Sequence, residues 1–141
     1  MSNKPIDNTS CYCLKMRRTA GNIVNFYDTM LAPSGVTVRQ YSLLYAIASG
    51  MPCTVAELAA RTELDRSTLA RSLKPLLKSN LVVDAKESGT RNSRLALTQE
   101  GMMVKEQAEK LWVKAQKAFE EKLTSEQLSA LEDVLTALQM L

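Results

Sequence analysis

The chain has 141 residues, of which 45% are hydrophobic, and a formal net charge of +3 at pH 7. This length supports one compact domain and little more. The sequence contains no histidine, which excludes the hydrolytic triads and the mixed zinc sites that depend on it. Because no nucleophile can be matched with a base, we expect neither an enzyme nor a resident metal or cofactor.

The N-terminus and the cysteines indicate a cellular compartment. Residues 1–10 contain no apolar signal core, and no apolar run in the chain is long enough to span a bilayer. Three cysteines, an odd number without an export signal, favour free thiols over a disulfide framework. The sequence therefore predicts a cytoplasmic protein that does not act at a membrane.

Two helices are predicted in the first third of the chain. The first spans about residues 9–31, begins at a Thr9 or Ser10 cap and repeats its apolar side chains at steps of three and four. A proline, a serine and a glycine then interrupt the helical pattern. Thr37 and Gln40 have the spacing of a capping box, which predicts the start of a second helix.

Residues 54–83 predict two short helices joined by a tight turn. Thr54 and Glu57 form another capping box, and the helix that follows them ends near Thr62. Asp65 is a good N-cap for the next helix. The apolar stripe of that helix consists of Leu69, Leu73, Leu76 and Leu77. Two helices in this arrangement make a helix-turn-helix.

The outward face of the second of these helices carries no acidic residue. Turning its leucines inward leaves outside Arg66, Ser67, Thr68, Ala70, Arg71, Lys74 and Lys78. Groups in the first turn can reach base edges, and the lysines can lie against phosphates. We expect Asp65 to be occupied in capping, and Pro75 to cause a kink or an early end of the helix. A solvated amphipathic helix would carry a similar pattern.

Residues 81–97 predict a β-hairpin after that helix, with Asn80 as a left-handed residue between them. In segments 81–86 and 94–97, successive side chains fall into two alternating sets, one for each face of a β-strand. Arg91 and Arg94 lie at or beside the tip of the polar loop. A helix-turn-helix followed directly by a basic hairpin is a winged helix, whose wing reaches the DNA backbone or the minor groove.

Charge is distributed unevenly along the chain. Residues 61–94 contain eight basic residues and four acidic ones, whereas residues 99–141 contain five basic and eight acidic residues. This difference indicates that the middle of the chain faces a polyanion and the C-terminal part does not.

Residues 99–141 predict a long helix and a last helix, which Thr124 and Gln127 cap. Together with residues 9–31 they carry more apolar surface than a winged-helix core can cover. We therefore expect these segments to form a dimerisation lobe with a second copy, beside a DNA-binding lobe of residues 37–98. The expected fold is mainly α, a winged helix-turn-helix with a three-helix core, a β-hairpin wing and terminal dimerisation helices. A monomeric helical bundle is the alternative.

This order of elements resembles the MarR family of bacterial transcription regulators over nearly the whole chain. The resemblance is carried by TVAELA at 54–59, DRSTLAR at 65–71, KSNLV at 78–82 and LTQEG at 97–101. It implies a homodimer that binds pseudo-palindromic double-stranded DNA, usually as a repressor and with stress responses among its roles. A small molecule or an oxidant would release the DNA.

The wing departs from the family pattern at one position. Many members carry an Asp two residues before the main wing Arg. Arg91 matches that Arg, but Gly89 stands at the position of the Asp. The bracing of Arg91 must therefore come from another residue.

Two alternative signals are considered for such a switch, and the first is oxidation. Cys11 and Cys13 lie in the first turn of the first helix, where the positive helix end favours a thiolate. Cys13 and Tyr27 resemble the hydroperoxide-sensing branch of the family, in which the cysteine meets tyrosines of the other subunit. Val38 occupies the place of the second tyrosine. Alternatively, Cys13 is a small buried hydrophobe and Cys11 a surface thiol.

The second input is a small aromatic ligand, an acid or a phenol. It would bind between the dimerisation lobe and the winged helix, in a pocket lined by Arg17, Tyr41 and Tyr45. The sequence supports this pocket only through the positions of the three residues.

Two other functions were compared with DNA binding. A winged helix can bind protein instead of DNA, but the exposed cations argue against that module because protein interfaces are depleted in lysine. A thiolate metal sensor built on Cys11 and Cys13 would need two further ligands from the partner subunit.

Overall fold

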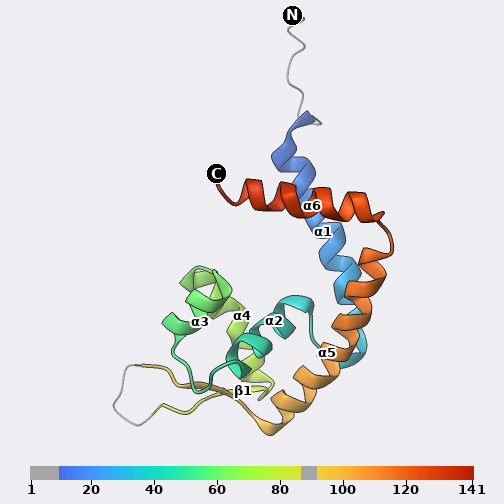
Figure 1. The fold of residues 1–141 in the computed structure, drawn as a ribbon. Helices are drawn as coiled ribbons and strands as arrows, with labels where there is room; N and C mark the ends of the chain where they lie inside the picture. The colour runs from blue at the N-terminus through green and yellow to red at the C-terminus, as the bar shows by residue number, and fades with distance from the viewer. Residues whose placement is uncertain (1–9, 87–91) are drawn as a thin grey trace, which may run out of the picture.

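The computed structural model describes residues 10–86 and 92–141, which form six α-helices, one 3-10 helix and a two-stranded sheet (Figure 1). In chain order these are α1 (Tyr12–Leu31), η2 (Ala32–Ser34), α2 (Val38–Ala48), α3 (Val55–Thr62), α4 (Arg66–Lys78), β1 (Val82–Asp84), β2 (Leu95–Leu97), α5 (Gln99–Glu120) and α6 (Ser125–Leu138). Helices α2, α3 and α4 with the β-hairpin form the predicted winged helix-turn-helix. In the described ranges, no helix has the length and hydrophobicity that crossing a membrane requires.

Side-chain caps define where most of these helices begin. The three predicted capping boxes are present at the starts of α2, α3 and α6, headed by Thr37, Thr54 and Thr124. Helix α1 begins differently, because its N-cap residue is Cys11 and makes no side-chain cap bond. The predicted cap at Ser10 was therefore wrong, and Thr9 lies outside the described residues.

The end of α4 is closed by a left-handed residue, as predicted. Asn80 has φ 60°, and its amide donates to the Leu77 carbonyl at 3.2 Å. The amide of Leu81 donates to the Leu76 carbonyl at 3.0 Å, which completes a Schellman motif. The helix continues past Pro75 to Lys78, so the expected early end was wrong. Buried Leu76 holds the last turn against the core despite the amide that proline lacks.

The wing is anchored by strands shorter than the sequence predicted. β1 and β2 are antiparallel, with Val82 opposite Leu97. Leu81 lies in the turn after α4 instead of in the strand, so Leu81 and Val82 are both buried. Cys53 adds an isolated bridge, because its amide donates to the Leu95 carbonyl at 2.9 Å and its carbonyl accepts from the Leu95 amide at 2.7 Å. The segment before α3 is thereby tied to the base of the wing.

The core lies where the three helices of the winged helix meet the hairpin and α5. Its largest fully buried side chains are Leu31, Leu43, Leu44, Ile47, Leu58, Leu69, Leu76, Leu95, Val82 and Cys53. Helix α5 runs beside the C-terminal part of α1 and also packs on α2 (Figure 1). The C-terminal part of α1 and helix α5 thus pack directly on the winged helix.

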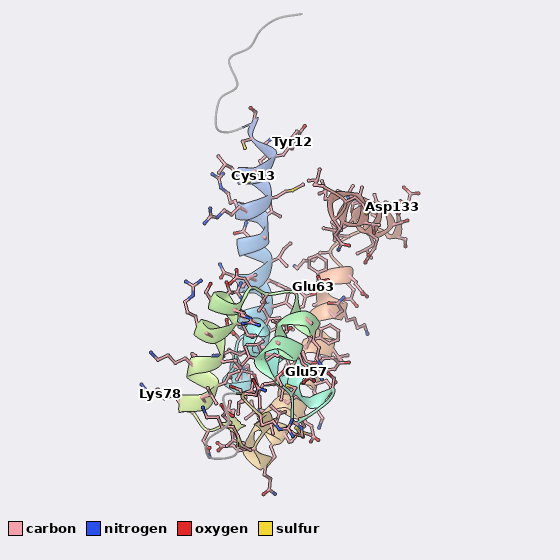
Figure 2. The ribbon with its side chains drawn as sticks, turned by 90° about the vertical axis from the view of Figure 1, so that its left-hand side faces the viewer. Tyr12, Cys13, Glu57, Glu63, Lys78 and Asp133 are labelled. Atoms are coloured by element: carbon pink, nitrogen blue, oxygen red, sulfur yellow. The ribbon has the colours of Figure 1, made fainter. Side chains whose placement is uncertain are left out.

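Two helical segments project from this body. Residues 12–20 of α1 are all exposed, and α6 buries none of its residues. The view of Figure 1 draws α6 across α1, but the perpendicular view of Figure 2 shows the two helices apart. The apolar side chains of both segments are therefore largely uncovered within one chain, with Leu128, Leu131 and Leu138 of α6 half-buried.

Gly101 lies where α5 crosses the turn that follows α4. The Thr98 hydroxyl donates to the Asn80 carbonyl at 2.7 Å, and the Thr98 amide donates to the Leu81 carbonyl at 3.1 Å. These two bonds bring the helix start so close that a Cβ on Gly101 would lie 2.0 Å from the Leu81 oxygen. Only glycine fits this crossing without a shift of the backbone.

We predict that Gly101→Ala lowers the free energy of unfolding by about 3 kcal/mol, because the new methyl group must displace backbone. Urea denaturation of the two proteins measures the difference. The matched control is Gly21→Ala in α1, where a Cβ meets nothing within 4 Å. The control should be neutral or slightly stabilising. Equal effects of the two substitutions would contradict the assigned role of Gly101.

Candidate nucleic-acid interface

One face of α4 forms a continuous basic stripe, defined here as Ser67, Arg71, Lys74 and Lys78. Their spacing of four, three and four residues places them on one side of the helix. All four are exposed, whereas Leu69, Leu73 and Leu76 on the opposite side are buried. The stripe is about 16 Å long at 1.5 Å per residue. This length and charge suit a duplex groove.

Two predicted features of α4, at Leu77 and Thr68, differ in detail, whereas Arg66 is exposed as predicted. Leu77 was expected in the apolar stripe but is 40% exposed, because its position lies at the border of the buried face. Arg66 is exposed beside the basic stripe, and Thr68 is half-buried. The end of the basic face therefore also carries an apolar side chain.

Asp65 caps α4, as the sequence predicted. One carboxylate oxygen accepts from the Thr68 amide at 2.7 Å and from the Ser67 hydroxyl at 2.8 Å. The Thr68 amide contributes most, and then the Ser67 hydroxyl, to holding the pKa of Asp65 at about 2. The Ser67 hydroxyl donates its proton to Asp65 of the same chain. It can therefore only accept a hydrogen bond from an outside partner.

The base of the wing is organised by Asp84, which the sequence reasoning did not single out. One of its oxygens accepts from the Arg94 amide at 2.9 Å and from the Lys86 amide at 3.2 Å. The Arg94 amide is the main reason that the pKa of Asp84 is lowered. These bonds fix the backbone that carries the exposed Arg94 side chain. Arg91 lies outside the described residues.

Arg61 has a structural role and is not part of the basic stripe. Its guanidinium donates to the Ala46 carbonyl at 3.0 Å and to the Gly50 carbonyl at 2.8 Å, at the end of α2. It also lies 3.7 Å from the Glu57 carboxylate. Arginine at this place joins α2 to α3 and compensates the negative end of the α2 dipole. The basic count of the middle segment therefore overstates the charge available to a partner.

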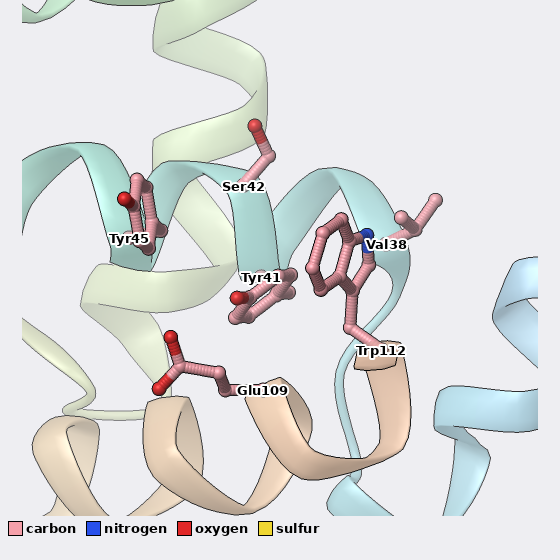
Figure 3. Close-up of a pocket in the computed structure, with 6 residues that line it drawn as sticks. All are labelled: Val38, Tyr41, Ser42, Tyr45, Glu109 and Trp112. Atoms are coloured by element: carbon pink, nitrogen blue, oxygen red, sulfur yellow. The ribbon is translucent and has the colours of Figure 1, made fainter. Parts of the chain in front are cut away.

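A pocket of about 490 Å³ lies between α2 and α5 (Figure 3). Its lining consists of Val38, Tyr41, Ser42, Tyr45, Glu109 and Trp112. The predicted residues Tyr41 and Tyr45 are both present, with ring centroids 6.4 Å apart, and the Trp112 ring lies 6.2 Å from Tyr41. Arg17 is not in the lining, because it lies on the projecting part of α1. Glu109 and Trp112 come from α5, far away in sequence, and were missed.

The three cysteines are free and lie in different environments. Cys13 is exposed and Cys11 is half-buried. Cys53 is buried, and burial raises the pKa of its thiol, with a smaller opposing effect of the Arg61 charge. A protonated, enclosed thiol is unreactive. Among the described residues, no group of three or more His, Cys, Asp and Glu side chains could hold a metal ion.

Tyr27 already has a partner in its own chain. Its hydroxyl donates to the Gln116 side-chain oxygen on α5, and its ring lies 6.1 Å from that of Phe119. Burial, and secondarily the charge of Glu120, raises the pKa of this hydroxyl. A cysteine of a second subunit would have to donate to the phenol oxygen, since the phenol proton is engaged.

A helix-turn-helix with an exposed basic stripe and a following hairpin defines a winged helix-turn-helix protein. Known proteins agree with this class. Residues 34–91 match the MarR family model. The transcriptional regulator SarZ of Staphylococcus aureus is 29% identical over 108 residues, which are 76% of this chain and 73% of SarZ. These matches support a MarR-family transcriptional regulator, a class of protein that is not an enzyme.

Solved structures resemble the chain over nearly its whole length. The regulator MosR of M. tuberculosis, crystallised with DNA, is 29% identical with a TM-score of 0.76 over 93% of this chain and 98% of MosR. BpsR of Bordetella bronchiseptica, whose DNA binding 6-hydroxynicotinic acid regulates, is 17% identical with a TM-score of 0.84 over 98% and 100% of the chains. The likeness to BpsR shows a shared fold alone.

We predict that Asp65→Ala lowers the thermal midpoint of unfolding at neutral pH, because the Thr68 and Ser67 donors lose their acceptor. The folded pKa of Asp65 lies below the ordinary 3.8, so the carboxylate stabilises the fold above that pH and loses its effect as pH falls toward about 2. The difference between parent and variant should shrink over this range. The control Asp65→Asn should cap nearly as well; a midpoint as low as that of the alanine variant would contradict capping.

Proposed function

We propose that this regulator binds double-stranded DNA through α4, with the wing beside it. The basic stripe carries this proposal, because it is exposed, continuous and placed on the second helix of the helix-turn-helix. Arg71 and Ser67 lie near the N-terminal part of α4, where side chains of a recognition helix reach base edges. Lys74 and Lys78 follow toward the phosphate backbone. Arg66, Thr68, Arg91 and Arg94 complete the proposed contact surface.

The proposed binding unit is a homodimer. Its support is the uncovered apolar surface on residues 12–20 and on α6, which a second copy of the same segments would bury. Residues 9–31 and 99–141 then form the dimerisation lobe, and residues 37–98 the DNA-binding lobe. In a two-fold dimer, the two α4 helices enter successive major grooves about 34 to 36 Å apart. The operator is therefore a pseudo-palindrome.

We predict that Arg71→Ala weakens operator binding about tenfold or more and leaves the dimer intact, because the lost guanidinium lies on the groove-facing side of α4. Gel-shift titration at fixed salt measures the affinity. The matched control is Lys110→Ala, which removes one exposed positive charge from α5. Equal affinities of the parent and the Arg71 variant would refute the interface.

The salt dependence of the same titration separates phosphate contacts from base contacts. Replacing Lys74 or Lys78 should reduce the slope of log affinity against log salt by about one, because one phosphate contact is lost. A chain that binds no DNA at any salt concentration would favour the protein-interaction module.

We propose that the regulator is a repressor and that a small aromatic ligand in the pocket between α2 and α5 releases it from DNA. The pocket supports this role because its walls come from both lobes: Tyr41 and Tyr45 belong to the winged helix, whereas Glu109 and Trp112 belong to the long helix. A ligand that changes the distance between these walls changes the separation of the two α4 helices. Binding and release are then coupled without a contact between ligand and DNA.

Oxidation of Cys13 is a second candidate input. The exposure of Cys13 on the projecting part of α1 favours it, because a peroxide can reach this thiol. Its thiolate would attack the peroxide, forming a sulfenic acid and releasing an alcohol. Cys13 and Tyr27 are fourteen residues apart on one helix, roughly 21 Å, so they can meet only across a dimer. Cys11 would then be the neighbouring thiol that resolves the sulfenic acid.

Under the redox proposal, an organic hydroperoxide should weaken operator binding of the parent, and Cys13→Ser should bind the operator equally well with and without it. Gel shifts before and after reduction with a thiol test whether the change is reversible. Cys53→Ser is the control, because its thiol is buried. A parent that binds DNA equally in both states ends the redox proposal and leaves the pocket as the input.

A further inference from the structure

The pocket between α2 and α5 has an aromatic wall and one acidic group. Figure 3 shows the rings of Tyr41 and Tyr45 on α2, with Trp112 and the Glu109 carboxylate reaching them from α5. Burial and then the charge of Glu109 raise the pKa of Tyr41, so the field of this carboxylate reaches the ring. Tyr41 is 6% exposed, which makes it the floor of the pocket.

The position of Lys105 indicates that Glu109 and Tyr45 attract positive charge. Its ammonium lies 3.5 Å from a Glu109 oxygen and 5.6 Å from the centroid of the Tyr45 ring. A carboxylate and the face of an electron-rich ring both attract a cation. Lys105 itself is not in the pocket lining. Glu109 and the Tyr45 ring thus already have one cationic partner, supplied by the chain.

Among the described residues, the pocket lining contains no positively charged side chain that could pair with an aromatic acid. Arg17, which the sequence suggested for this role, lies elsewhere on α1, and Lys105 is paired with Glu109. Arg39 does not line this pocket but a neighbouring hollow, with which the pocket shares Val38 and Ser42. An anion in the pocket would therefore lie beside a carboxylate of the same sign.

We propose that this pocket binds an aromatic organic cation, such as a quaternary or protonated amine, in place of an aromatic acid. The cationic group lies at Glu109 and the faces of Tyr41 and Tyr45, where it displaces the ammonium of Lys105. The apolar part of the ligand packs against Trp112 and Val38. This inference rests on the proposed effector role of the pocket and names the chemical class of the effector.

Trp112 is the single tryptophan of the chain, so its emission reports ligand binding without any label. Titration of the full-length protein, in the absence of DNA, uses benzyltrimethylammonium as the cation, benzoate as the anion and benzyl alcohol as the neutral probe. We expect the cation to change the emission saturably and to bind about tenfold more tightly than benzoate.

Two substitutions test the charges separately. Glu109→Gln should weaken cation binding about tenfold and leave benzyl alcohol unchanged, because only the charge is removed. Lys105→Met should strengthen cation binding, since the competing ammonium is gone. Arg17→Ala, the control on α1, should change neither. Circular dichroism checks that each variant keeps its helix content.

Tighter binding of benzoate than of the cation would overturn the proposal, as would the absence of a saturable response to the cation. An unchanged order of affinities in Glu109→Gln would also overturn it. A protein that binds the cation but no DNA contradicts the proposed function alone. A protein that binds DNA but not the cation contradicts this inference alone.

Discussion

The close crossing of α5 over the turn after α4 is the contact on which the rest of the architecture depends. At this point the Leu81 carbonyl, the Asn80 carbonyl and the Thr98 hydroxyl meet around a residue without a side chain. The crossing joins the helix that carries the basic stripe, the first strand of the wing and the helix that lines the pocket. Both proposed DNA-contacting elements and the pocket-lining helix are thereby connected through one contact.

The sequence predicted those parts of the fold that local chemistry determines. Helix starts at Thr37, Thr54 and Thr124 follow from side chains that satisfy amides three residues away. Asp65 and Asn80 behave as expected for the same reason, because a cap or a left-handed turn involves only neighbours in the chain. The alternation of the hairpin was also readable, although its strands are shorter than the pattern.

The features that the sequence did not reveal depend on residues distant in the chain. Arg61 looks like one more cation, and only folding places it on the carbonyls of Ala46 and Gly50. Glu109 looks like a solvated helix residue until α5 packs on α2 and brings it beside Tyr41. Arg17 was assigned to the pocket by its position in the chain, but α1 carries it away from the body. Pair contacts of this kind leave no periodic signal.

Helix α6 has 14 residues and buries none of them in its own chain. An isolated helix of this length is marginally stable in water. In the proposed homodimer, packing against a second copy stabilises α6, so the free energy of folding includes a concentration term and the melting temperature rises with the amount of protein. For a regulator, this links the abundance of the polypeptide to the fraction of molecules that are structurally complete.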